Sequence, residues 1–194
     1  MNQDLDKQLC QKYPKIFKDR RGDMKETLMC WGFEHGDGWY DIIDNMCHAI
    51  QSHLDWKEQT RQHAINFNQM LEDARHGDWR AFNEYHAKFN ADYVSKTRET
   101  FLENEPKAIP DPIPQVVAVQ VKEKFGTLRF YYNGGDEYTH GISAMAEYMS
   151  ATTCEECGSR GRRRPGGWMQ TLCDEHARAA GKYDEEDDDN PSEF

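Results

Sequence analysis

The chain has 194 residues, which suits one domain with a small appended module and is too short for two full-size domains. No apolar run approaches the roughly 20 residues of a membrane span, and the N-terminal segment lacks the apolar core of a signal peptide, so we expect a cytoplasmic protein with no membrane contact. The net charge of −11 disfavours nucleic acid and favours basic partners for the chain as a whole.

The first helices follow from periodicity and capping residues. Residues 5–13 predict a short helix, after which a proline breaks the chain. A glycine-rich loop follows at residues 31–38, and Asp37 can cap a helix that begins at Gly38 or Trp39. From there apolar residues recur at steps of three and four, which places them on one buried helical face: Trp39, Ile42, Ile43, Met46, Ile50 and Leu54.

The same segment holds residue types that ligate metals or move protons, and together they form a possible second polar site: Cys30, His35, Asp37, Asp41 and Cys47. A second metal site would use Cys30, His35 and Cys47, although nothing in their spacing identifies a fourth ligand. A hydrolase would instead use His35, Asp37 and Asp41. The alternative is that a His and an Asp in such a loop serve helix capping and solvent contact.

Residues 55–105 contain no proline and a single glycine, and they predict a helical hairpin that is broken at residues 76–78. We interpret the apolar stripes of its two arms as core and not as a platform for stacking nucleobases. The residues of the stripes are Ile65, Phe67, Met70 and Leu71 in the first arm, and Trp79, Phe82, Tyr85 or His86, Phe89 and Tyr93 in the second.

The pattern changes after a proline-rich linker at residues 106–114. Residues 116–121 and 127–132 predict two strands that are joined by a short turn containing Gly126. A further short helix at about 142–149 precedes a cysteine-rich segment. The predicted fold class is therefore α+β, with helices, a small antiparallel β-hairpin and a C-terminal zinc-knuckle module.

The strongest motif is CEECGSRGRRRPGGWMQTLCDEH at residues 154–176. Its two pairs at metal-ligand spacing supply three thiolates and one imidazole for Zn²⁺: Cys154, Cys157, Cys173 and His176. Protein atoms would fill all four tetrahedral positions, which predicts a structural zinc site. Apolar cover for the ion would come from Trp168 and Leu172. The alternative is that these are ordinary reduced cysteines of a cytosolic protein.

Charge is concentrated at two places near the C-terminus. Arginines crowd the loop of the zinc module, where we expect them at the surface, in contact with phosphate or with an acidic partner: Arg160, Arg162, Arg163 and Arg164. The acidic run at 184–189 is interpreted as a solubilising tail, with a tether to the arginines or a mimic of a phosphate backbone as alternatives. The expected organisation is an α+β domain over 1–150, a zinc module over 151–183 and an acidic tail over 184–194.

Three segments taken together resemble a widespread family of uncharacterised phage and prophage proteins: CWGFEHGDGWYDIID, VKEKFGTLRFYYNGGD and CEECGSRG…GGWMQTLCDEH. The resemblance covers roughly residues 12–54 and 113–177, in the same order. Family members commonly have Cys where this chain has His35, which would preserve a soft ligand. Many are also shorter before the VKEKFG strand, which marks about residues 57–105 as an insertion that would carry partner specificity. The resemblance implies no activity.

Two classes of function follow from these features. The first, which we favour, is a phage accessory protein without catalytic activity that binds a host or defence protein in the host cytoplasm, through its acidic surface and helical hairpin. The second is a nucleic-acid-binding or nuclease-type protein, in which the arginines of the zinc module and Lys182 contact phosphates. No recognisable catalytic motif accompanies the zinc module, so we lean away from an enzyme.

Overall fold

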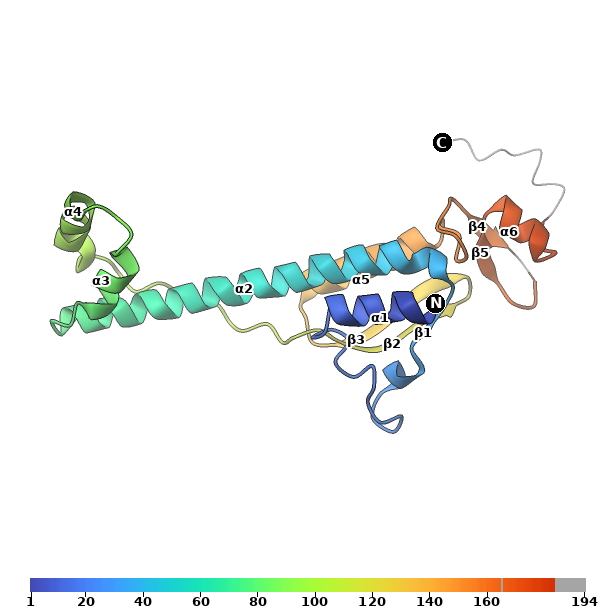
Figure 1. The fold of residues 1–194 in the computed structure, drawn as a ribbon, viewed down its shortest axis with the longest axis horizontal. Coiled ribbons are helices and arrows are strands. Elements are labelled where there is room, and N and C mark those ends of the chain that lie inside the picture. The colour runs from blue at the N-terminus through green and yellow to red at the C-terminus, as the bar shows by residue number, and fades with distance from the viewer. Residues whose placement is uncertain (165, 184–194) are drawn as a thin grey trace. The chain divides into compact units, whose positions relative to one another are not determined.

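Figure 1 shows a computed structural model of the protein, which describes residues 1–164 and 166–183. The expected α+β class is confirmed, since the chain is mainly helical, contains an antiparallel strand pair and has a Cys/His cluster near the C-terminus. The chain divides into two compact units, one made of Met1–Leu54 with Pro114–Phe194 and the other of Asp55–Ile113. The acidic tail expected at 184–194 lies outside the described residues.

The N-terminal part of the first unit is organised by helix α1, Gln3–Lys12. The side chain of Asn2 accepts hydrogen bonds from the backbone N–H groups of Asp4 and Leu5 and so caps the helix. Arg20 donates to Asp6 on this helix and to the carbonyl oxygen of Cys30, which ties the following loop to α1. That loop contains the 3-10 helix η1, Leu28–Trp31, and leads into the short strand β1, Phe33–Glu34.

Helix α2, Tyr40–Arg75, begins after a 3-10 turn at Asp37–Trp39 and runs without interruption for 36 residues. The apolar face that ends at Leu54 and the first arm of the predicted hairpin are thus one continuous helix, because the chain holds neither glycine nor proline between Trp39 and His76. The predicted apolar face is confirmed, because all of its residues are buried: Trp39, Ile42, Ile43, Met46, Ile50 and Leu54.

The sheet of the first unit has the strand order β1-β2-β3. Strands β2, Val117–Lys124, and β3, Thr127–Asn133, form the predicted antiparallel hairpin. Strand β1 pairs in parallel with β2, and Phe33 lies opposite Val121. The sequence did not indicate β1, because two residues are too short for an alternating pattern.

Helix α5, Glu137–Ser150, begins with a capping box between Asp136 and Thr139. It lies beside the edge strand β3, and its side chains satisfy backbone N–H groups of that strand. Ser150 Oγ accepts from the N–H of Leu128 at 2.8 Å, and Glu147 Oε1 accepts from the N–H of Phe130 at 3.2 Å. This edge of the sheet is therefore covered, which leaves it less open to pairing with another strand.

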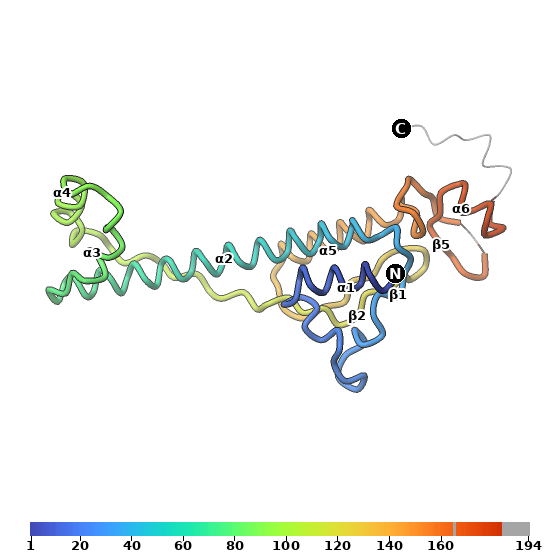
Figure 2. The backbone as a smooth tube through the Cα atoms, viewed as in Figure 1, coloured from blue at the N-terminus to red at the C-terminus, as the bar shows by residue number. Residues whose placement is uncertain are grey.

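The second unit comprises the last part of α2, then α3, Arg80–His86, and α4, Ala91–Phe101, which Figure 2 traces. The predicted break at 76–78 is present, and Gly77 there has a φ of +88°. The expected single second arm is two helices, because Asn90 accepts from the N–H of Tyr93 and starts α4 anew. The unit has its own core: Met70, Leu71, Ala74, Phe82 and Phe101.

The aromatic stripe of the second arm is only partly core. Phe82 and His86 are buried, whereas Tyr85, Phe89 and Tyr93 are 54%, 43% and 48% exposed. Of the alternatives Tyr85 and His86, His86 is therefore the residue on the buried face of α3. Phe89 and Tyr93 leave this face because α3 ends at His86 and α4 starts anew after it. The proline-rich stretch that follows α4 has no regular secondary structure, as expected. No helix in the described ranges is long and apolar enough to cross a membrane.

Candidate metal centre

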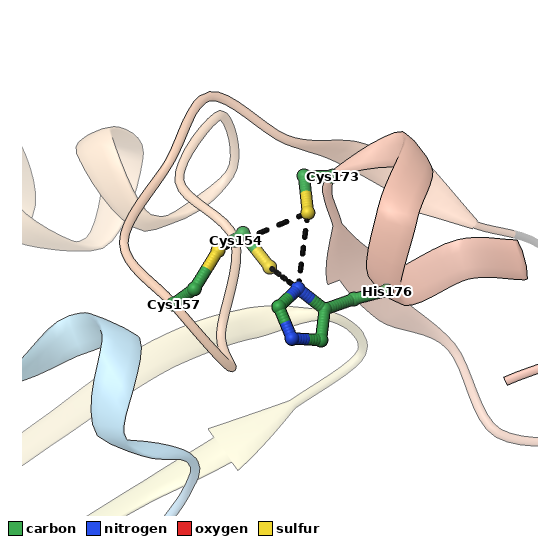
Figure 3. A group of neighbouring side chains, drawn as sticks. All are labelled: Cys154, Cys157, Cys173 and His176. Atoms are coloured by element: carbon green, nitrogen blue, oxygen red, sulfur yellow. Dashed lines mark hydrogen bonds between the residues drawn. The ribbon is translucent and has the colours of Figure 1, made fainter. Parts of the chain in front are cut away.

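The four residues with metal-ligand spacing converge near the C-terminus, as Figure 3 shows. One ligand atom from each lies within 4.8 Å of all the others: Cys154, Cys157, Cys173 and His176. Cys157 Sγ is 3.8 Å from Cys173 Sγ, and His176 Nδ1 is 3.7 Å from Cys154 Sγ. In the described part of the chain, this is the one group of three or more such residues that could hold a metal ion.

The first ligand pair lies on a tight turn. The N–H of Cys154 donates to the carbonyl oxygen of Ser159 at 2.7 Å, and the N–H of Gly158 donates back to Cys154 at 2.9 Å. Gly158 has a φ of +76°, a conformation that side-chain-bearing residues rarely adopt, and it lets the chain reverse after Cys157. Both thiols of the C-x2-C pair therefore point to the same side of the turn.

The second ligand pair lies where a small hairpin meets a helix. Strands β4, Arg162–Arg164, and β5, Gln170–Leu172, are antiparallel, and helix α6, Asp174–Ala179, follows directly. Cys173 occupies the N-cap position of α6, and His176 lies in its first turn. The spacing of three residues places both ligands over one end of the helix.

The glycine-rich loop before α2 supports the site from outside. The N–H of Gly38 donates to the carbonyl oxygen of Glu155 at 2.7 Å, and the N–H of Gly36 donates to the Glu155 carboxylate at 3.0 Å. Trp39 Nε1 donates to the carbonyl oxygen of Thr153 at 2.8 Å. The C-x2-C turn is therefore fixed to the N-terminal end of α2, a connection that spans more than 110 positions of the chain and that no local pattern reveals.

The surroundings of the ligands shift their pKa values in different directions. The hydrogen bond from Ser159 lowers the pKa of Cys157 to about 7, whereas burial raises the pKa of Cys154. The hydrogen bond with the thiol of Cys173 raises the pKa of His176. A bound cation would replace the protons that these sulfur atoms otherwise hold or share.

The apolar cover of the site differs from the prediction. Leu172 is buried and packs with Cys154 and Ala177, as expected. Trp168 is 67% exposed and lies in the loop between β4 and β5, so its predicted role in covering the ion is wrong. The run of glycines around Trp168 supplies no neighbouring side chains that could bury the indole.

The four arginines do not form the uniform surface cluster that we expected. Arg164 is 2% exposed and donates to the carboxylate of Asp174, so the prediction of a surface role is wrong for this residue. Arg162 lies 3.6 Å from the same carboxylate, and Arg163 donates to the carbonyl oxygen of Phe125 at 2.6 Å. Arg160 is exposed. Most of these side chains therefore hold the module together or dock it on the β2–β3 turn.

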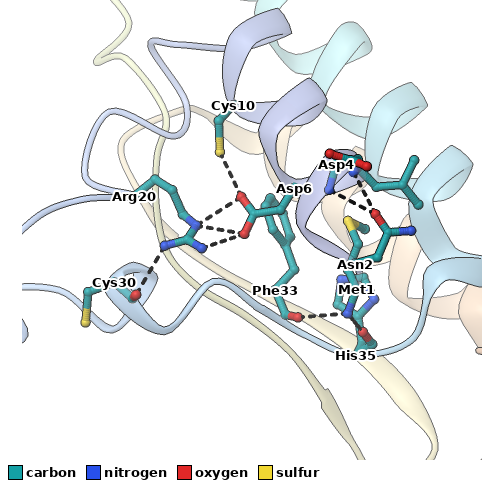
Figure 4. Close-up of polar contacts among 10 residues, drawn as sticks. Met1, Asn2, Asp4, Asp6, Cys10, Arg20, Cys30, Phe33 and His35 are labelled. Carbon is teal, nitrogen blue, oxygen red and sulfur yellow. Dashed lines mark hydrogen bonds and ion pairs between the residues drawn. The ribbon is translucent and has the colours of Figure 1, made fainter.

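The possible second polar site is not assembled as a metal centre. Figure 4 shows Cys30 and His35 within the contacts around α1. The thiol of Cys30 donates to the carbonyl oxygen of Thr27, while Asp37 accepts from the backbone and side chain of Asn2. Cys47 is fully buried in the core.

Asp41 lies in the first turn of α2, where a carboxylate favours the positive end of the helix dipole. His35 is buried, and its Nδ1 donates to the carbonyl oxygen of Gly36 at 2.7 Å. Its Nε2 is buried without a hydrogen-bond partner, and burial lowers the pKa of His35 to about 4. These residues therefore have separate structural roles in helix capping, core packing and loop contacts, and they do not converge on a common site.

Comparisons of the chain with models of protein families, with curated proteins and with solved structures give no match. The resemblance to phage and prophage proteins accordingly stays a prediction. The residues that sequence reasoning missed at this site are Gly36, Gly38 and Glu155, which join the loop to the C-x2-C turn. The clustered glycines of GFEHGDGWY were the available signal, because such clusters often mark a close approach of two backbones.

Proposed function

We propose that Cys154, Cys157, Cys173 and His176 bind one structural Zn²⁺. Metal–sulfur bonds of about 2.3 Å and metal–nitrogen bonds of about 2.0 Å in a tetrahedron separate two sulfurs by about 3.8 Å, and sulfur from nitrogen by about 3.5 Å. The separations of 3.8 Å between Cys157 and Cys173, and of 3.7 Å between Cys154 and His176, are close to these values. Cys173 Sγ and His176 Nδ1 are 3.1 Å apart, so these two atoms would move apart by a few tenths of an ångström to hold the ion. Three thiolates and an imidazole favour zinc over magnesium or calcium, which prefer oxygen ligands.

The function that we infer for the whole chain is protein binding by the helical unit, with the zinc-containing unit as its scaffold. The observation that carries this proposal is the exposure of three aromatic side chains on a unit that already has its own core: Tyr85, Phe89 and Tyr93. Aromatic residues are enriched in protein interfaces, where they supply much of the binding free energy. As before, the partner that we propose is a host or defence protein in a phage-infected cell.

The nucleic-acid alternative has less support from the geometry. Arg164 is buried against Asp174, and Arg163 is committed to the carbonyl oxygen of Phe125. Phosphate binding by these arginines would therefore compete with contacts that hold the module together. Among these arginines, Arg160 is exposed and could contact a phosphate without breaking such a contact.

The test is to replace residues 55–113 with a short Gly-Ser linker. Gln51 and Gln115 exchange side-chain hydrogen bonds at 3.3 and 2.9 Å, so the two ends of the first unit lie side by side and a short linker can join them. We expect the shortened protein to bind one Zn²⁺ per chain, because all four ligands and their supporting loop remain. Affinity capture from infected cells should then recover the partner only with the full-length chain.

A matched pair of variants separates binding from folding. Changing Tyr85, Phe89 and Tyr93 to Ser should abolish capture, whereas Tyr148→Ser, on an 80% exposed tyrosine of the first unit, should not. Capture should survive nuclease treatment and weaken only modestly with salt. Capture by the shortened chain, or salt-sensitive DNA binding that depends on the zinc module, would contradict the proposal and favour the nucleic-acid alternative.

A further inference from the structure

The helical unit contains a cavity of about 400 Å³ between α2, α3, α4 and the segment that follows α4. Sites for small molecules typically enclose about 300–1,000 Å³, so this cavity is of suitable size. Its apolar lining consists of side chains from all three helices: Phe67, Met70, Ala81, Tyr85 and Phe101. Three of these five are aromatic, and the rings of Phe67 and Phe101 meet edge to face at 5.7 Å. Such a wall suits a flat aromatic group.

The polar part of the lining contains amides, a hydroxyl and basic groups: His63, Asn66, His86, Thr97, Asn104 and Lys107. Among the described residues around the cavity there is no carboxylate, although Asp and Glu outnumber Lys and Arg by 35 to 24 in the chain. An anionic group inside the cavity would therefore meet donors and a positive charge and would not be repelled by its immediate lining.

Lys107 is held at the wall of the cavity. Its ammonium nitrogen lies 4.3 Å from the centre of the Phe67 ring, and its backbone exchanges two hydrogen bonds with the side chain of Asn68, at 2.7 and 2.8 Å. None of the ion pairs found in residues 1–164 and 166–183 involves Lys107. Its charge is thus positioned beside an aromatic surface and is not neutralised by a carboxylate there.

His86 adds a second oriented group. Its side chain is buried, and its Nδ1 donates to the carbonyl oxygen of Phe82 at 2.8 Å. Because Nδ1 carries the proton of this hydrogen bond, Nε2 of the neutral ring is an acceptor, and it can take a hydrogen bond from a hydroxyl or N–H group of a ligand. The ring also stacks close to Phe82, with centroids 4.1 Å apart, which fixes its orientation.

We propose that this cavity binds a small aromatic anion, with the ring of the ligand against Phe67 and Tyr85 and its anionic group at Lys107. The inference does not depend on the proposed protein partner, because it rests on the lining of the cavity alone. The class of ligand follows from the combination of an aromatic wall, a positioned ammonium group and the absence of carboxylates from the described lining.

The test compares naphthoate with naphthamide, which have the same ring system and differ in charge. Each is titrated into the full-length protein and followed by amide-resolved NMR. We expect naphthoate to shift the amide signals of α3 and of residues around Lys107, with a dissociation constant of about 1 mM or tighter. Naphthamide should bind about fivefold more weakly, which corresponds to one favourable contact between partly exposed charges.

Two variants test separately whether the Lys107 charge contributes to binding and whether the ligand lies in the cavity. Lys107→Met keeps the length of the side chain and should weaken naphthoate about fivefold while leaving naphthamide unchanged. The matched control is Lys88→Met, because Lys88 also lies over an aromatic ring, that of Phe89 at 5.3 Å, but does not line the cavity. Ala81→Phe, at an exposed position of the lining, should fill the space and abolish binding of both compounds.

Two results would overturn the proposal. Equal affinities for naphthoate and naphthamide, together with no effect of Lys107→Met, would show that the cavity does not select an anion. Shifts that persist in the Ala81→Phe protein, or that appear outside the helical unit, would place the binding site elsewhere. The NMR spectrum of each variant without ligand shows that the fold is retained, so loss of binding can be assigned to the site.

Discussion

At the scale of single residues, Gly38 determines how closely the glycine-rich loop approaches the metal ligands. A Cβ at this position would lie 2.2 Å from the carbonyl oxygen of Cys154 and 2.4 Å from the backbone nitrogen of Gly158. Both atoms belong to the turn that carries two ligands, so Gly38→Ala must displace them. We expect the affinity for Zn²⁺ to fall about 10-fold or more, as measured by competition with a chromogenic chelator.

The control for this variant is Gly141→Ala in the middle of α5. A Cβ there meets no atom within 4 Å, so the substitution should leave zinc affinity unchanged and stabilise the helix by about 0.5–1 kcal/mol. Wild-type zinc affinity in Gly38→Ala would show that the loop does not position the ligands.

His35 should make the stability of the protein depend on pH. Burial lowers its pKa from 6.5 to about 4, so between these values the unfolded chain binds a proton that the folded protein excludes. The free energy of unfolding should therefore fall as the pH falls through this window, by about 1.4 kcal/mol per pH unit. Urea unfolding at pH 7 and pH 5 measures the effect.

His35→Asn keeps a side-chain donor near the carbonyl oxygen of Gly36 but does not titrate, so its stability should change less between the two pH values. His140→Asn, at an exposed position on α5, should behave as the wild type. Protonation of the metal ligands affects all three proteins alike, so the difference between variants isolates His35. An identical pH dependence in His35→Asn would contradict the prediction.

At the scale of elements, Arg164 joins strand β4 to the start of helix α6. Its guanidinium is 2% exposed and donates to the carboxylate of Asp174, which is itself 57% exposed. Arg164→Met should lower the free energy of unfolding of this module by about 2 kcal/mol, because a buried charge-assisted hydrogen bond is lost while Asp174 can return to water. Hydrogen exchange of the segment from β4 to α6 in increasing urea, read by mass spectrometry, measures the transition.

Arg160→Met is the matched control, because Arg160 is an exposed arginine of the same module. Its effect should stay within about 0.5 kcal/mol. Equally small effects of both substitutions would contradict the prediction for Arg164.

At the scale of the whole molecule, removal of the metal should affect one unit and spare the other. Structural zinc contributes about 10–16 kcal/mol of apparent binding free energy in small modules, so a chelator should unfold the segment around β4, β5 and α6. The helical unit should persist, because the packing of Met70, Leu71 and Phe82 involves no metal ligand. Hydrogen exchange read by mass spectrometry should lose protection in the first segment and keep it in α3 and α4. Equal loss in both would contradict this independence.

Several features were determined by the sequence because they depend on neighbours along the chain. The four ligands were predictable from two pairs at fixed spacing, and the structure brings them within 4.8 Å of one another. The buried face of α2 follows from helical periodicity, and the β2–β3 hairpin from two apolar runs on either side of Gly126. These are local patterns, in which backbone geometry alone relates one residue to the next.

Only the tertiary structure decided the features that arise between distant segments. Strand β1 exists because Phe33 pairs with Val121, and Gly38 matters because Cys154 lies against it. Arg164 is buried by the packing of its own hairpin on α6, although its three neighbours in sequence suggested a surface cluster. The cavity beside Lys107 likewise requires three helices and the following segment to meet. Burial and close approach depend on which surfaces come together, and the order of residues along the chain does not specify that on its own.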